Sequence, residues 1–134
     1  MIVDTSAVVA VLRGEEDAPR HLAAMEEADR LRMSAATLVE LAVVVDARRD
    51  PVLSRRLDEL LDLLGVEVEP FTAEQAAVAR RAYRDYGKGS GHAAGLNLGD
   101  CFAYALASVT GEALLSKGDD FAATDLLAAL DGAG

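Results

Sequence analysis

The chain has 134 residues, of which 51% are hydrophobic, and a formal net charge of −10. This is the size of one compact domain with its own core, so we expect a single domain over residues 1–134. The composition excludes a membrane-spanning helix, which needs about 20 consecutive apolar residues, an internal disulfide, since Cys101 is the lone cysteine, and a zinc site, for which one cysteine and two histidines are too few ligands.

The same features bear on location and on binding partners. The first residues do not resemble a secretory signal, and a single cysteine suits a reducing compartment, so we expect a cytoplasmic protein. The acidic charge argues against simple nonspecific nucleic-acid binding, which relies on an excess of Lys and Arg.

Short apolar runs alternate along the chain with longer helical patterns, which predicts an α/β fold with a mainly parallel sheet covered by helices. Asp50 and Pro51 are expected to start one helix and Gly65 to end it, and Thr72 and Gln75 have the spacing of a capping box at the start of another helix. In chain order, the expected elements are a strand at 1–3, helices at 5–12 and 15–28, a strand at 31–34, helices at 35–49 and 51–65, a strand at 66–70, a helix at 73–87, a glycine-rich loop at 87–99, a helix at 100–111, a strand at 113–116 and a turn at 117–121.

Asp4 follows the first predicted strand and precedes two hydroxyl residues, Thr5 and Ser6. One interpretation is structural, because Asp is a favoured N-cap of helices. The other is chemical, because ligands of open α/β sheets bind beyond the carboxyl ends of the strands, where Asp4 lies. Thr5 and Ser6 are also able to cap the helix, which weakens the structural interpretation.

Glu40 is unusual because of its helical neighbours. The residues three and four positions away are Ala36, Thr37, Val43 and Val44, which form an apolar surface around it. An unpaired carboxylate is costly to bury there. Glu40 is therefore exposed at an edge, paired with an arginine elsewhere, or part of a functional site.

Three further acids occupy positions like that of Asp4. Asp100 opens a predicted apolar helix, and Asp119 and Asp120 follow the last predicted strand. Each alone has an ordinary explanation as a helix cap or a turn residue, although Asn97 or Gly99 offers an alternative cap near Asp100.

Together, these acids predict a metal centre. Three or four carboxylates in one cleft repel one another unless a cation neutralises them. Oxygen ligands without thiolate or imidazole select Mg²⁺ or Mn²⁺. One such ion, or a pair about 4 Å apart, activates water and stabilises the charge that develops on a phosphate. The predicted reaction is metal-dependent hydrolysis of a phosphodiester.

Four segments, MIVDTSAVVAVL, AATLVEL, GLNLGDCFAYALA and LLSKGDDFAATDL, resemble in order and spacing the PIN-domain ribonucleases, specifically the VapC toxins of type II toxin–antitoxin modules. The similarity covers essentially the whole chain. It implies a three-layer α/β/α PIN fold and an Mg²⁺-dependent endoribonuclease that cleaves a structured transfer-RNA or ribosomal-RNA loop. It also implies inhibition by a VapB-type antitoxin, and a homodimer.

The resemblance also implies roles for individual acids. Asp4 matches the first metal-binding acid and Asp100 the third, also on the metal, with waters completing the Mg²⁺ shell. Glu40 matches the acid on the helix, where it would orient or deprotonate the attacking water or help to hold a second metal. A water nucleophile predicts products with a 5′-phosphate and a 3′-hydroxyl.

At two positions of the family pattern, either of two neighbouring residues matches. The fourth acid falls at Asp119 or Asp120, with Asp119 favoured as nearer the metal and sharing the role of the helix acid. Thr5 or Ser6 matches the hydroxyl that hydrogen-bonds the metal cluster or its waters.

Binding of RNA needs local positive charge, and binding of an antitoxin suits the acidic cleft. A basic antitoxin tail would place Arg among the carboxylates, and the helices over residues 35–64 offer a groove for an amphipathic antitoxin helix. The basic residues, each group equally explained as a solvated helix face, are Arg80, Arg81, Arg84 and Lys88, and Arg48, Arg49, Arg55 and Arg56.

Several other features have plain interpretations. The loop GKGSGHAAG lacks the spacing of a phosphate-binding P-loop, so we interpret it as a flexible lid or an RNA contact. His92 in this loop is expected at the surface, and Cys101 is expected in the core.

Two other classes of protein remain as alternatives. A receiver or phosphatase-like domain also places an Asp after its first strand, and Lys117 follows a late strand, but the other acids of those motifs are missing. A catalytically inactive PIN-like scaffold that binds protein or RNA is the second, and the filled acid positions argue against it.

Overall fold

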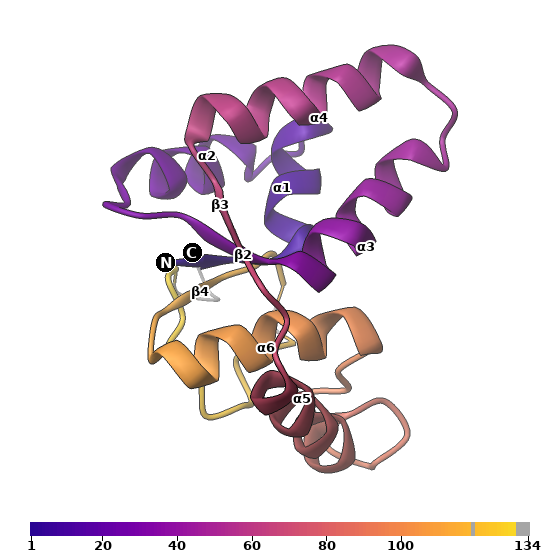
Figure 1. Ribbon diagram of the computed structural model, residues 1–134, viewed down its shortest axis with the longest axis vertical. Coiled ribbons are helices and arrows are strands. Elements are labelled where there is room, and N and C mark those ends of the chain that lie inside the picture. The colour runs from indigo at the N-terminus through magenta and orange to yellow at the C-terminus, as the bar shows by residue number, and fades with distance from the viewer. Residues whose placement is uncertain (119, 131–134) are drawn as a thin grey trace.

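The computed structural model describes residues 1–118 and 120–130, and Figure 1 shows its helices and strands. Within these residues, the elements in chain order are β1 (Ile2–Val3), α1 (Thr5–Leu12), α2 (Ala18–Glu27), β2 (Arg32–Ser34), α3 (Ala35–Asp46), α4 (Pro51–Leu64), β3 (Glu67–Glu69), α5 (Ala73–Tyr86), α6 (Leu98–Thr110) and β4 (Leu114–Leu115). Each strand and helix expected from the sequence is present.

The strands form one sheet in the order β3-β2-β1-β4, and every neighbouring pair is parallel. Helices α1 to α4 lie on one side of the sheet and α5 and α6 on the other (Figure 1). Parallel strands need crossover connections, which the helices supply here. The expected three-layer α/β/α fold with a parallel sheet is confirmed.

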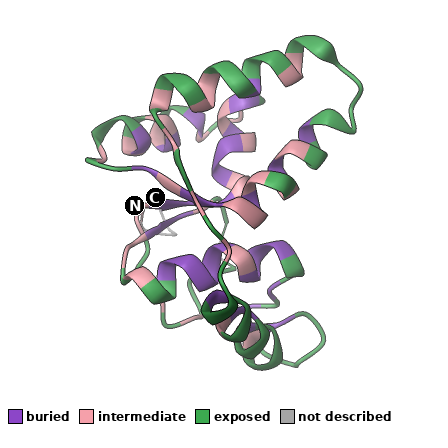
Figure 2. Ribbon diagram, viewed as in Figure 1, coloured by how far each residue is buried: buried purple, intermediate pink, exposed green. Residues whose placement is uncertain are grey.

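Side-chain alternation along the short strands builds two cores, one on each face of the sheet. Ile2 of β1 and Leu114 of β4 pack with α5 and α6, whereas Val3 and Leu115 pack with α1, α2, α3 and α4. The buried residues accordingly lie on the sides of the helices that face the sheet (Figure 2). The sheet is therefore covered on both faces, and its strand ends are the accessible part.

Three helix boundaries differ from expectation by two residues or more. Helix α2 begins at Ala18, with Pro in its first turn, rather than at residue 15, and α3 ends at Asp46 rather than at residue 49. Helix α6 begins at Leu98, two residues before the expected start, because Asn97 is its N-cap. The shift of α6 follows from its capping box, whereas α2 begins without a side-chain cap.

The capping box expected at Thr72 and Gln75 forms only in part. Thr72 accepts from the backbone N–H of Gln75, but the Gln75 side chain donates to the Pro70 carbonyl at 3.1 Å instead of returning to the cap. Helix α4 has the expected Asp50 cap, and it ends at Gly65 with a left-handed φ of 64°, as expected for a C-terminal glycine.

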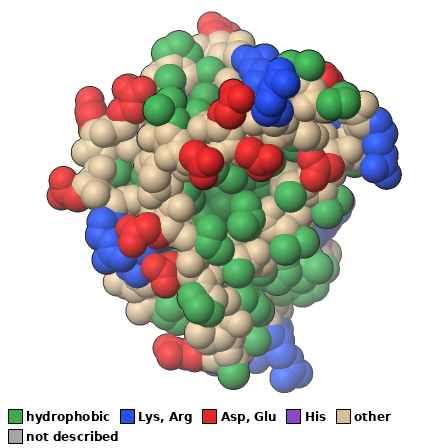
Figure 3. All heavy atoms as spheres, turned by 45° about the horizontal axis from the view of Figure 1, so that its top comes forward, with side chains coloured by type: hydrophobic (Ala, Val, Ile, Leu, Met, Phe, Trp, Pro, Cys, Tyr) green, Lys and Arg blue, Asp and Glu red, His purple; other side chains and the backbone are tan. Residues whose placement is uncertain are grey.

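The valines of α3 are less buried than its apolar sequence indicates. Val39 and Val43 are 63% and 61% exposed, on a side of the helix that no described element covers. On the face of the molecule drawn in Figure 3, hydrophobic side chains gather in the middle and acidic ones are spread around them. Among the described residues, no helix has the length and hydropathy needed to cross a membrane.

The glycine-rich loop is anchored at both ends. Lys88 N–H donates to the Leu96 carbonyl at 2.8 Å and Leu96 N–H to the Tyr86 carbonyl at 2.9 Å, while the Leu96 side chain is fully buried. His92 is exposed, as expected, with its ring against Tyr86 at a centroid distance of 4.8 Å. Cys101 is buried in the core, as predicted.

Candidate active site

The candidate site lies where the direction of the chain across the sheet reverses. From β1 the chain moves to β2 and then β3, and it returns on the other side of β1 to form β4. Crevices at such switch points, beyond the carboxyl ends of the strands, are the usual ligand sites of open parallel sheets. Asp4 lies directly after β1, and its backbone N–H donates to the Leu115 carbonyl of β4 at 2.9 Å.

Asp4 is both a helix cap and a buried acid. Its Oδ2 accepts from the Ser6 N–H at 3.1 Å and the Ser6 hydroxyl at 2.7 Å, which caps α1. Its Oδ1 is buried without a hydrogen-bond partner. Burial, reinforced by nearby Glu40, raises the pKa of Asp4 to about 6. A cation beside Oδ1 would satisfy this oxygen and restore the charged form.

Ser6 connects the start of α1 to the turn after β4. Its hydroxyl donates to Asp4 and accepts from the Lys117 N–H at 2.9 Å. The Lys117 ammonium pairs with Glu15 at 3.2 Å and Asp17 at 3.4 Å. The turn after β4 is thus tied to α1 by a hydrogen bond and to the segment between α1 and α2 by ion pairs, which also gives Lys117 a role unlike that of a receiver lysine.

The carboxylate of Glu40 accepts a hydrogen bond from one hydroxyl group and lies close to the backbone of Gly99. The Thr5 hydroxyl donates to Glu40 Oε1 at 2.7 Å. The other carboxylate oxygen, Oε2, lies so close to Gly99 that a Cβ at position 99 would overlap with it. Glu40 is half-buried, and its position next to α6 depends on the missing side chain of Gly99.

Asp100 is fixed by the start of α6. In a complete capping box, Asn97 accepts from the Asp100 N–H at 2.9 Å, and Asp100 Oδ2 accepts from the Asn97 N–H at 3.0 Å. Burial is the main reason that the pKa of Asp100 is raised to about 6, and the charges of Asp4, Asp120 and Glu40 raise it further. These four acids are therefore close enough to interact electrostatically.

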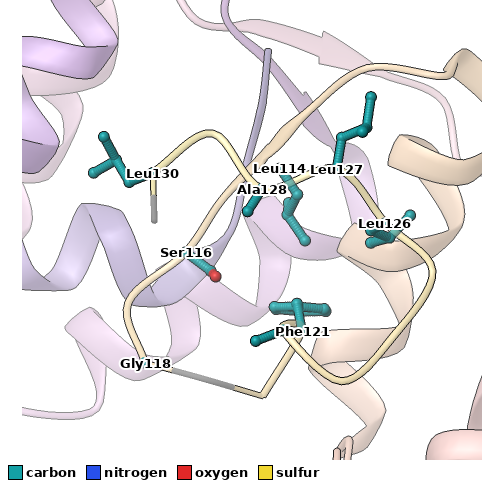
Figure 4. Close-up of a pocket in the computed structure, with 9 residues that line it drawn as sticks. Leu114, Ser116, Gly118, Phe121, Leu126, Leu127, Ala128 and Leu130 are labelled. Atoms are coloured by element: carbon teal, nitrogen blue, oxygen red, sulfur yellow. The ribbon is translucent and has the colours of Figure 1, made fainter. Parts of the chain in front are cut away.

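Of the two candidates for the fourth acid, the structure describes only Asp120. Asp119 lies outside the described residues, so its favoured role stays a prediction. Asp120 precedes Phe121, whose side chain is buried against the core that contains Leu114 (Figure 4). This anchor places Asp120 within electrostatic range of Asp100.

These residues fit a hard divalent cation. The donors are carboxylate oxygens, two of the acids have raised pKa values, and Asp4 has a buried oxygen without a partner. Across residues 1–118 and 120–130, no three Asp, Glu, His or Cys side chains already form a metal-binding group. Mg²⁺ commonly takes only one or two protein carboxylates and keeps several waters, so Asp4 and Asp100 would suffice.

Sequence reasoning missed two contributors to this site. Gly99 was considered only as a helix cap, and the Lys117 N–H was not considered as a partner for Ser6. Nothing local identifies either contact, because each joins segments far apart in the sequence. The Asn97 and Asp100 spacing, in contrast, is a recognisable capping-box pattern.

The raised pKa of Asp100 has a consequence for stability in the absence of metal. A carboxyl group that is more basic in the folded state binds more protons than in the unfolded state, so its contribution to stability falls as pH rises from about 4 to about 6. We expect the Asp100→Asn variant to become progressively more stable than the unmodified chain over this range, with a constant gap above it. Urea unfolding in EDTA measures this gap, and a gap independent of pH would contradict the shift.

The chain is similar to proteins of one known family over nearly all its length. The family model of the PIN domain matches residues 1–127. Ribonuclease VapC28 of Mycobacterium tuberculosis is 54% identical over 131 residues, which cover 98% of this chain and 98% of that protein.

Solved structures resemble the fold at low sequence identity. VapC20 of M. tuberculosis, described as a sarcin–ricin loop cleaving toxin, has a TM-score of 0.72 and 18% identity, covering 94% of this chain and 95% of that one. A toxin–antitoxin complex from Klebsiella pneumoniae has a TM-score of 0.67 and 19% identity, covering 90% and 89%. With more than half of its residues shared with VapC28 and a PIN-domain match from residue 1 to residue 127, the chain belongs to the VapC ribonucleases of the PIN-domain family.

Proposed function

We propose that this ribonuclease is an Mg²⁺-dependent endoribonuclease toxin that hydrolyses a phosphodiester bond in a structured transfer-RNA or ribosomal-RNA loop. The observation that carries the proposal is the buried, unpartnered Oδ1 of Asp4, next to Glu40 and Asp100 at the switch point of the sheet. Single-stranded loops suit this role because they expose bases that helical RNA hides. Mn²⁺ has the same ligand preference and is the alternative ion.

Each acid has a part in the proposed reaction. Asp4 and Asp100 would hold the ion, which supplies charge neutralisation at the phosphate and a more acidic water. Glu40, oriented by Thr5, would accept the proton of the attacking water. Asp119 or Asp120 would assist by orienting this water or holding a second ion. Attack by water leaves a 5′-phosphate and a 3′-hydroxyl.

Cleavage of total cellular RNA tests the proposal. The purified chain is incubated with RNA in Mg²⁺ or in EDTA, beside an Asp100→Asn variant, and the product ends are mapped. Discrete cuts with 5′-phosphates, seen only with metal and only with the unmodified chain, are expected. Cyclic phosphates on the products would contradict the water mechanism, and cutting in EDTA would contradict the role of the metal.

The hydrogen bond to Glu40 yields a separate prediction. Thr5→Val keeps the shape of the side chain but removes the hydroxyl that orients the carboxylate. We expect the cleavage rate to fall by about 10- to 100-fold, the usual cost of removing a group that orients a metal-site residue. Thr5→Ser retains a hydroxyl and should keep most of the activity. Equal rates for the Val and Ser variants would show that this hydrogen bond does not matter.

The proposed partner is a VapB-type antitoxin in the cytoplasm. The K. pneumoniae structure is a toxin–antitoxin complex of similar fold, and an acidic cleft in a chain of net charge −10 suits a basic antitoxin tail with an Arg among the carboxylates. The exposed valines Val39 and Val43 on α3 provide apolar surface for the homodimer that we also propose. Loss of inhibition when that Arg is replaced, with folding retained, would support this mode of binding.

An inactive scaffold that binds protein or RNA is the second candidate. It predicts RNA binding without cleavage, and binding that does not change in Asp100→Asn. The close interaction of the acids favours the nuclease, because a scaffold has no need of two carboxylates whose burial costs stability.

A further inference from the structure

The short turn from Lys117 to Phe121 follows β4 and carries Asp120. Its first residue is fixed by the hydrogen bond from the Lys117 N–H to the Ser6 hydroxyl at 2.9 Å. Its last residue is fixed by the buried side chain of Phe121, and Gly118 between them has a left-handed φ of 90° (Figure 4). Because one residue extends a chain by at most about 3.6 Å, these two anchors restrict the position of Asp120.

The side chain of Lys117 connects this turn to the segment between α1 and α2. Its ammonium lies 3.2 Å from a carboxylate oxygen of Glu15 and 3.4 Å from one of Asp17. An isolated ion pair at the surface contributes little to stability, whereas several charges in one network hold each other in a defined geometry. The contacts of Lys117 are therefore better suited to fixing the turn than to stabilising the whole protein.

Asp17 has the position of a helix cap but does not cap its helix. It directly precedes α2, and its side chain makes no capping hydrogen bond, although Asp is among the favoured N-caps. Instead, Oδ2 contacts His21 Nε2 at 3.0 Å and Oδ1 faces the Lys117 ammonium. The Asp17 side chain is thus used for these two contacts in place of the cap.

His21 contacts Asp17 from the interior of the protein. Its side chain is 4% exposed, and its Nδ1 is buried without a hydrogen-bond partner among the described residues. A carboxylate only accepts hydrogen bonds, so Nε2 carries the proton that points to Asp17. An unpartnered buried nitrogen costs stability, so the contact with Asp17 explains this histidine better than packing does. We call Lys117, Glu15, Asp17 and His21 the Lys117 network.

The chain beyond the turn is fixed to the face of α6 that carries Asp100. Tyr104 follows Asp100 by four residues, so both side chains lie on one face of the helix. The buried Tyr104 donates from its hydroxyl to Asp125 at 2.6 Å. Asp120 therefore lies between a segment fixed near Asp4 and a segment fixed to α6.

We propose that the Lys117 network positions Asp120 toward Asp100 and so supports RNA cleavage from outside the acid cluster. The inference rests on the proposed function, in which an acid of this turn orients the attacking water or holds a second ion. The Lys117 ammonium pairs with carboxylates of the α1–α2 segment, so Lys117 is a positioning residue and not a catalytic one.

Replacing Lys117 distinguishes positioning from a direct contact with RNA. Lys117→Met should lower kcat for RNA cleavage about tenfold, the smaller of the usual losses when a group that supports a metal site is removed, and should leave KM unchanged. Lys117→Arg keeps the charge and should restore most of the rate. A raised KM with an unchanged kcat would overturn the proposal, because Lys117 would then bind RNA itself.

Variants at Asp17 test whether the partner of Lys117 matters. Asp17→Asn should lower kcat as Lys117→Met does, and the two changes together should lower it no further. Glu16→Gln makes the same change of charge at an exposed neighbour and should keep the normal rate. Arg30→Met, which removes an ion pair with Glu67 near the amino ends of the strands, should also keep it. Equal losses in these controls would overturn the proposal.

A double variant tests whether the effect depends on Asp120. Asp120→Asn should itself lower kcat, and adding Lys117→Met should cause no further fall, because the acid that is positioned has already been removed. A normal rate in Asp120→Asn would overturn the proposal. A further tenfold fall in the double variant would do the same.

Hydrogen exchange of the metal-free protein gives a measurement that does not depend on cleavage. NMR in EDTA follows the N–H of residue 117, which is bonded to Ser6, and the N–H of Leu96, which is bonded to the Tyr86 carbonyl. Lys117→Met and Asp17→Asn should speed exchange several-fold at residue 117 and leave it unchanged at Leu96. Unchanged exchange at residue 117, or an equal rise at both amides, would overturn the proposal. An unmodified chain that does not cleave RNA would contradict the proposed function but not this exchange result.

Discussion

Replacing Asp4 with Asn is expected to abolish RNA cleavage and, at the same time, to make the metal-free protein more stable. The amide retains an oxygen that accepts from Ser6, so the cap of α1 survives. It cannot be ionised, so the cost of burying the charge disappears. That cost is up to about 3 kcal/mol at neutral pH, from a pKa raised to about 6. Activity should fall by more than about 100-fold, since a direct ligand matters more than its supporting groups.

The chain offers a matched control for this variant. Asp50 caps α4 in the same way, accepting from Val52 and Leu53, but it is exposed. Asp50→Asn should change neither the cleavage rate nor the free energy of unfolding. Both variants are measured by RNA cleavage in Mg²⁺ and by urea unfolding in EDTA. Cleavage at the normal rate by Asp4→Asn would remove Asp4 from the metal site.

Gly99→Ala is expected to reduce cleavage at least about tenfold, although position 99 carries no functional group. The new methyl would occupy the place of the Glu40 carboxylate, which must move because it is the flexible end of its side chain. Stability should change by no more than about 1 kcal/mol, because Ala favours a helix over Gly by about that amount. Loss of activity without loss of stability would show that Gly99 acts by positioning Glu40.

A double variant tests whether the substitution at Gly99 lowers the cleavage rate through Glu40. If Gly99 acts through Glu40, the double variant Gly99→Ala with Glu40→Gln should be no less active than Glu40→Gln alone. If the losses of cleavage rate in the two single variants instead add in the double variant, the methyl group disturbs Asp100 or α6 rather than Glu40. Cleavage rates of the three variants, measured on one RNA, decide between these outcomes.

The order of elements was predictable because each short apolar run and each helical pattern is a local property of the sequence. Asp4 could be placed beyond the carboxyl end of a strand for the same reason, since it follows directly on β1, whereas the switch point became known only from the strand order. Asp100 was found as an acid at the start of an apolar helix, although Asn97 rather than Asp100 opens that helix.

The contacts that tune the site were not predictable, because they form between segments that meet only in the folded chain. Whether Glu40 was exposed, paired with Arg or functional could not be decided until Thr5 and Gly99 were placed beside it. The degree of exposure of Val39 and Val43 could not be predicted for a similar reason. An apolar helix indicates burial only when another element covers it, and periodicity does not show what covers it.

The most direct measurement for the proposed metal centre is calorimetric titration of the chain with Mg²⁺ at about pH 6 and at about pH 8. Because the pKa values of Asp4 and Asp100 are raised to about 6, binding should release protons at the lower pH and very few at the higher. Binding should be lost in Asp4→Asn and in Asp100→Asn and be retained in Asp50→Asn. Unchanged binding in the first two variants would place the ion elsewhere and contradict the assignment of the active site.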